Sequence, residues 1–186
     1  MKTHKLSFPT LFQVDDYIEF HAARILLLLH NCNGIIEGRT KLAKLDFFLR
    51  YPAAIKRVID LRLINTSEMD LKQLIIIPNS IESQMIRYRY GPWDPKYQII
   101  IPFLQSLDLI QIHSRRAETY TITERGKQAV IELIKDPSYQ ELDFRSKTVY
   151  QIFGEWAGSQ IKKFIYDNFD EIVNLPIGEP IQSIGG

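Results

Sequence analysis

The residue types that carry most enzymatic chemistry are few in this sequence and lie far apart. Its 186 residues include one cysteine, Cys32, and four histidines, His4, His21, His30 and His113. His21 and His30 are nine positions apart, so on one helix, at about 100° per residue, they would point to opposite faces and could not share a metal ion. Cys32 has no base beside it and is interpreted as a buried structural residue. With no glycine-rich phosphate loop either, we expect no catalytic residues, no cofactor, no metal and no small-molecule substrate.

The basic residues indicate a different chemistry, the binding of an anionic partner. Residues 39–62 carry seven basic and two acidic groups, whereas residues 136–186 carry four basic and eight acidic groups. Such polarised charge suits a nucleic acid at the first segment and not at the second. Solvated helix faces and a polar hairpin tip are the alternative explanation. The candidate DNA-binding residues are Arg39, Lys41, Lys56, Arg57, Arg62, Arg115 and Arg116.

Three helices are expected in the first third of the chain to position these residues. The apolar spacing of Ile18, Ala22, Ile25 and Leu29 predicts a helix over 17–30. A second helix should follow residue 40 and end near Pro52, and a third should cover 53–61. Three short helices in succession are typical of a helix-turn-helix body. The third would then be the recognition helix that enters the major groove.

A strand pair is expected between two further helices. Residues 109–113 and 118–122 alternate as strands, and Arg115 and Arg116 fall at the tip between them. Asp94 and Pro95 begin the helix before the pair, and Thr123 caps the helix over 124–135. This order predicts a mainly α protein with a small β-hairpin, a winged helix-turn-helix with extra N- and C-terminal helices. We divide the chain into a tail (1–14), a winged-helix body (15–136), a helical extension (137–175) and a flexible tail (176–186).

Basic and aromatic residues alternate just before the helix that is expected to begin at Asp94 and Pro95. Tyr88, Tyr90 and Trp93 surround Arg87 and Arg89. Aromatic rings interleaved with arginine can stack on nucleic-acid bases. At this spacing, however, we favour a strand that packs its rings into the core.

The C-terminal extension carries an apolar stripe with acidic neighbours. Large apolar residues recur at helical spacing from Ile161 to Phe169, and this stripe must be buried against either the body or a partner. We favour partial docking of a partner. The candidate partner-binding residues are Ile161, Phe164, Phe169, Asp167, Asp170 and Glu171.

Three segments carry a resemblance to a known family. GRTKLAKLDFFLRYP at 38–52, YGPWDP at 90–95 and YTITERG at 120–126 together resemble the middle component of prokaryotic ABC three-component systems, which include the Lamassu-type anti-phage defence systems. The resemblance covers roughly residues 15–180. It implies a non-catalytic winged-helix subunit that joins an SMC-like ABC ATPase to an effector nuclease.

Two other functions remain open on the sequence. One is a stand-alone winged-helix regulator that binds double-stranded DNA as a homodimer, and the other is an enzyme. The start of the chain lacks the apolar stretch of a signal peptide, and the lone cysteine suits a reducing compartment, so we expect a cytoplasmic protein. The longest apolar run, residues 25–29, is far shorter than the roughly 20 residues that cross a bilayer, so we expect no membrane contact.

Overall fold

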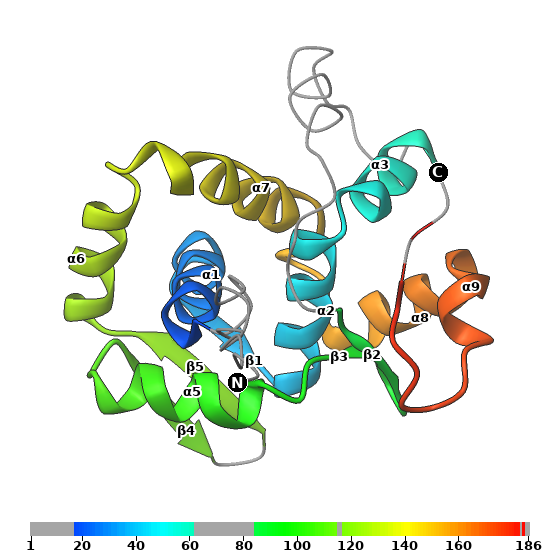
Figure 1. Ribbon diagram of the computed structural model, residues 1–186, viewed down its shortest axis with the longest axis horizontal. Coiled ribbons are helices and arrows are strands. Elements are labelled where there is room, and N and C mark those ends of the chain that lie inside the picture. The colour runs from blue at the N-terminus through cyan, green and yellow to red at the C-terminus, as the bar shows by residue number, and fades with distance from the viewer. Residues whose placement is uncertain (1–16, 62–83, 115–116, 183, 185–186) are drawn as a thin grey trace, which may run out of the picture.

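Helices dominate the computed structural model, which describes residues 17–61, 84–114, 117–182 and 184 (Figure 1). The helices are α1 Ile18–Asn31, α2 Arg39–Arg50, α3 Pro52–Asp60, α5 Tyr97–Ser106, α6 Glu124–Leu133, α7 Pro137–Phe153, α8 Gly158–Asn168 and α9 Asp170–Val173. The strands are β1 Ile35–Glu37, β2 Ile86–Tyr88, β3 Gly91–Trp93, β4 Ile110–Ser114 and β5 Glu118–Ile122. The predicted class, mainly α with a small β-hairpin, is confirmed at this level. Within the described residues, no helix is both long and apolar enough to span a membrane.

The leucine-rich helix α1 lies at the centre of the fold. Every residue from His21 to Leu29 is buried, because α5, α6 and α7 pack around it. Figure 1 shows α1 nearly end-on with these three helices about it. A helix with large apolar residues on most of its circumference requires such enclosure. The helix predicted over 17–30 is therefore confirmed.

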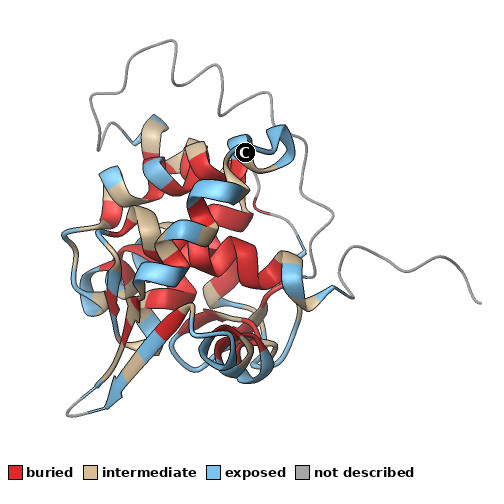
Figure 2. Cartoon of the chain, turned by 90° about the vertical axis from the view of Figure 1, so that its left-hand side faces the viewer, coloured by how far each residue is buried: buried red, intermediate tan, exposed pale blue. Residues whose placement is uncertain are grey.

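The predicted hairpin is confirmed, and a third strand extends it. β4 and β5 pair antiparallel, with Ile110 opposite Ile122. β1 pairs with the other edge of β5, which gives the strand order β1-β5-β4. The Thr123 hydroxyl accepts a hydrogen bond from the Gly126 N–H at 2.9 Å, so the predicted cap of α6 is present. Figure 2 shows that β4 and β5 extend from the body toward the hairpin tip, where the residues become exposed.

The C-terminal helices close the other side of the molecule. α7 packs against α1 and α2, and α8 packs against α2, so residues before and after position 137 share one core. The segment after α9 returns to the hairpin of β2 and β3. There Ile181 is buried, its N–H donates to the Met85 carbonyl, and its own carbonyl accepts from the Tyr51 hydroxyl. Ile181, in the segment that the sequence predicts as a flexible tail (176–186), thus packs against the body. The sequence did not mark this residue because the segment has no apolar periodicity.

Candidate functional site

The basic residues at the start of α2 bind other parts of this chain. Arg39 donates to both carboxylate oxygens of Glu118 at 2.8 Å and to the Tyr120 hydroxyl at 3.1 Å. The hydrogen bond that Arg39 donates to Tyr120, together with the nearby Glu118, raises the pKa of Arg39. Lys41 donates to the Gly154 carbonyl at 2.8 Å. These two candidate DNA-binding residues therefore tie α2 to β5 and to the end of α7.

Two candidate DNA-binding residues lie on α3. Lys56 forms an exposed ion pair, and Arg57 links α3 to another helix. Lys56 pairs with Asp60 at 2.8 Å, and both side chains are exposed. Arg57 pairs with Glu171 at 2.8 Å and lies over the Phe169 ring, so it fastens α3 to α9. The remaining candidates, Arg62, Arg115 and Arg116, lie outside the described residues.

These basic candidates do not form one surface within the described residues. Arg39 and Lys41 are at the first turn of α2, whereas Lys56 and Arg57 follow its end. A helix of this length separates its two ends by about 18 Å. A single patch that joins the two groups is therefore not formed.

The apolar stripe of the C-terminal extension is buried within this chain, which corrects the docking role expected for it. Ile161 and Phe169 are fully buried, and Phe164 is 9% exposed. Their rings and side chains pack in an aromatic cluster with Phe48 of α2 and Phe153 of α7, whose rings stack at 4.2 Å. An amphipathic pattern shows that a face must be covered, but not whether the cover is the same chain.

The three acidic candidates beside that stripe differ in their environment. Asp167 pairs with Lys163 at 2.6 Å on the exposed side of α8. Glu171 is held by Arg57, as described above. Asp170 is exposed in the first turn of α9. Asp167 and Asp170 are thus at the surface, without the apolar residues that were expected to accompany them.

A buried cluster of charged residues links α1, α2 and the segment before α5. Arg24 pairs with Asp46 at 2.8 Å, Arg50 pairs with Asp94 at 2.9 Å, and Tyr97 donates to Asp46 at 2.6 Å. Burial alone raises the pKa of Asp46, but the two arginines and the tyrosine hydroxyl outweigh it and hold this pKa below its usual value. Each charge lies beside its opposite, so the cluster is a structural link between the helices.

Cys32 is buried, as the sequence predicts, and its environment disfavours the thiolate. Burial raises the pKa of Cys32 to about 12, although Lys41 opposes this effect. Because the thiolate is the nucleophilic form, the thiol is unreactive at neutral pH.

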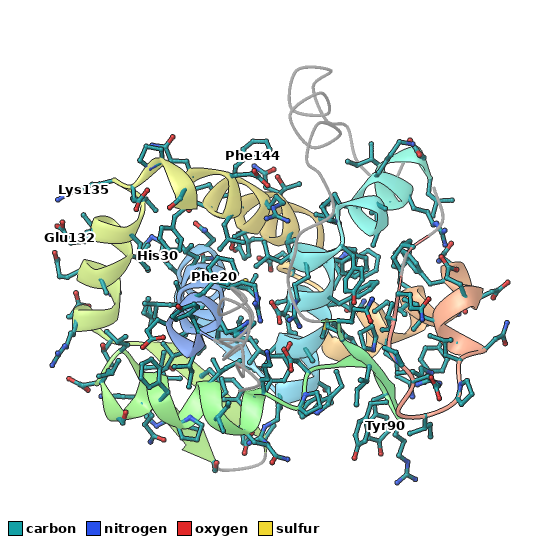
Figure 3. The ribbon with its side chains drawn as sticks, viewed as in Figure 1. Phe20, His30, Tyr90, Glu132, Lys135 and Phe144 are labelled. Carbon is teal, nitrogen blue, oxygen red and sulfur yellow. The ribbon has the colours of Figure 1, made fainter. Side chains whose placement is uncertain are left out.

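An open groove of about 470 Å³ lies between α1, α5 and α6, at the start of α7. We call it the apolar groove. Its main lining side chains are Leu26, Phe103, Leu107, Leu109, Leu133 and Tyr139. Three carboxylates, those of Glu19, Glu132 and Asp136, stand among the lining residues, and none of the described residues that line it is Lys or Arg. Figure 3 shows Glu132 on the outer side of α6.

The exposed face of α5, like the apolar groove, carries apolar residues and no basic residue. Ile99 and Pro102 are exposed on it beside Gln98 and Gln105, and the helix carries neither Lys nor Arg. Leu107, at the C-terminus of α5, is 39% exposed. Sequence reasoning missed this surface because three separate segments build it. The signal that was present is the excess of large apolar residues between 99 and 109, more than one helix face can bury.

Comparisons with known proteins give no match, so the chemistry of the surfaces is the evidence on function. No family model, no curated protein and no solved structure matches this chain.

Proposed function

We propose that this chain is a non-catalytic winged-helix adaptor, which joins an SMC-like ABC ATPase to an effector nuclease in an anti-phage defence complex. The order α1–β1–α2, followed by α5–β4–β5 with β1 on the edge of β5, agrees with a winged helix that holds residues 51–96 as an insertion. In such an arrangement α5, directly before the hairpin, takes the place of the recognition helix, which the sequence had favoured at α3.

The observation that carries the adaptor role is the chemistry of α5 and the apolar groove. A helix that reads DNA needs basic and polar groups directed at phosphates and base edges. The exposed face of α5 has two polar residues, Gln98 and Gln105, but neither Lys nor Arg, and it also exposes Ile99 and Pro102. The groove beside it is apolar with acidic groups. This surface favours a protein partner over a DNA duplex.

The groove also favours one kind of occupant. An amphipathic helix binds by placing its apolar face in such a groove. Glu132 pairs with Lys135, but Glu19 and Asp136 also stand among the lining residues, so a helix with Lys or Arg beside its apolar face would be complementary in charge. We therefore assign the groove to a basic amphipathic helix of the ATPase or the effector.

Co-purification of this chain with an SMC-like ABC ATPase and an effector nuclease from the same organism tests the proposal. We expect the three proteins to form one complex. Leu107→Glu should weaken the complex about tenfold or more, since it places a charge at a central apolar contact. Glu19→Lys should weaken it too, and more at low salt than at high salt.

Two matched variants serve as controls. Ile131→Glu makes the same change at an exposed apolar residue of α6 that does not line the groove, and Glu179→Lys reverses an exposed carboxylate elsewhere. Both should leave the complex intact. If the unchanged chain instead forms a homodimer that binds palindromic double-stranded DNA and does not associate with the ATPase, the regulator function replaces the adaptor.

A further inference from the structure

The turn between β2 and β3 presents aromatic rings to solvent. β2 and β3 pair antiparallel, and Tyr88 and Tyr90 are each 45% exposed while Arg87 is only 8% exposed. The prediction that these rings pack into the core is wrong for Tyr88 and Tyr90, whereas Trp93 is partly buried and packs against the core. Tyr88 and Trp93 lie 5.7 Å apart between ring centroids, and together with Tyr90 they line a pocket of about 200 Å³. Such rings cost free energy in water unless a ligand covers them.

Two cations from different elements lie over the Tyr90 ring. Arg89 lies 5.6 Å from the centroid of the Tyr90 ring, on the turn itself. Lys162 reaches from α8 and lies 5.2 Å from the same ring and 5.1 Å from the Tyr166 ring. The Tyr166 hydroxyl donates to the Arg89 carbonyl at 3.2 Å, which holds the turn against α8. We name Tyr88, Tyr90, Trp93, Arg89 and Lys162 the aromatic surface.

The positive charge at this surface is not neutralised by the described part of the chain. No carboxylate among the described residues lies within 4.0 Å of Lys44, Arg87, Arg89 or Lys162. The Nε of Arg87 is buried and has no hydrogen-bond partner there. Burial lowers the pKa of Lys44 to about 8, and the like charge of Lys162 adds to this shift. An anionic ligand would relieve the repulsion between these two lysines.

We propose that the aromatic surface binds single-stranded nucleic acid. Bases stack on Tyr88 and Tyr90, and the backbone phosphates lie beside Arg89 and Lys162. Aromatic rings accept any base by its face, and cations beside them track the backbone. A duplex is excluded, because its bases are already stacked on one another. An acidic peptide matches the charge but offers no flat ring for the pocket.

Fluorescence anisotropy with a labelled 20-nucleotide oligothymidine and the full chain tests this proposal. We expect saturable binding that weakens as salt increases. Tyr90→Ala should raise the dissociation constant at least about fivefold, whereas Tyr90→Phe, which keeps the stacking face, should retain most of the affinity. Lys162→Ala should reduce the slope of log K against log salt by about 0.7, the loss of one phosphate contact on a single strand.

The neighbouring lysine provides a matched control. Lys163 follows Lys162 on α8, but it points to the exposed side and pairs with Asp167, so Lys163→Ala should leave the slope unchanged. Tyr17→Ala removes a ring of similar exposure that is distant in the sequence from the aromatic surface, and it should leave the affinity for the oligothymidine unchanged. Circular dichroism confirms that each variant is folded.

Three results would overturn the proposal. The first is no saturable binding of the oligothymidine, and the second is equal affinity for Tyr90→Ala and the unchanged chain. The third is binding of a 20-base-pair duplex or a polyglutamate peptide as tight as that of the single strand. None of these results bears on the apolar groove, so this proposal and the adaptor function fail independently.

Discussion

Phe169→Ala is the substitution that most directly tests the burial of the C-terminal extension. The Phe169 ring is fully buried, with the rings of Phe47, Phe48 and Phe164 at 5.9, 6.0 and 6.1 Å and the guanidinium of Arg57 at 4.8 Å. Removing a ring enclosed on all sides leaves a cavity, and the free energy of unfolding should fall by about 3–5 kcal/mol. For a chain of this size the melting temperature should fall by roughly 6–20 °C.

Guanidinium unfolding of the isolated full chain measures this change. The midpoint should fall while the slope m stays constant, because the surface exposed on unfolding is nearly unchanged. Ile177→Ala is the control, since Ile177 is 67% exposed and its loss should change the stability by less than about 0.5 kcal/mol. A loss below about 1 kcal/mol for Phe169→Ala would refute the burial and return this residue to a partner-binding role.

Three further outcomes are expected for the isolated chain. Asp46→Asn should lower the stability by about 3–5 kcal/mol at pH 7, because it removes the charge of the close carboxylate partner of the buried Arg24, while Arg50 keeps Asp94. Since the pKa of Asp46 is lower in the folded than in the unfolded state, this difference should shrink below about pH 4, as urea unfolding at pH 3 and pH 7 will show. Gly126→Ala should cost about 1–3 kcal/mol by calorimetry, because its Cβ would lie 2.2 Å from a backbone carbonyl oxygen; an unchanged melting temperature would contradict this contact. Cys32 should react with a thiol reagent at pH 8 only when urea unfolds the chain, and rapid stoichiometric reaction of the folded protein would disprove its burial.

The elements that the sequence predicted well are those with local signals. The spacing of apolar residues defines α1, and the Thr123 cap with its hydrogen bond to Gly126 defines the start of α6. The alternation on either side of a polar tip likewise defines β4 and β5. In each case residues close together in the sequence determine the conformation, so no knowledge of the tertiary structure is needed.

The features that the sequence did not predict depend on distant residues. β1 has three residues and forms only because Ile36 pairs with Tyr120, more than 80 positions later. The buried cluster joins Asp46 to Arg24 and Asp94 to Arg50, and nothing near any of these residues marks it as buried. The apolar groove depends in the same way on three helices that meet only in the folded chain.

The two proposed binding surfaces differ in place and in charge, and both differences have consequences. In Figure 3, Glu132 on α6 and Tyr90 on the turn between β2 and β3 lie on opposite sides of α1 and α2. A helix in the groove therefore leaves the aromatic surface open. The carboxylates of the groove repel phosphate, whereas the unpaired cations near Tyr90 repel a basic helix, so charge alone directs each ligand to its own surface. One chain can then hold a protein partner and a single strand of nucleic acid together, which is the geometry an adaptor needs if it is to bring an effector to its substrate.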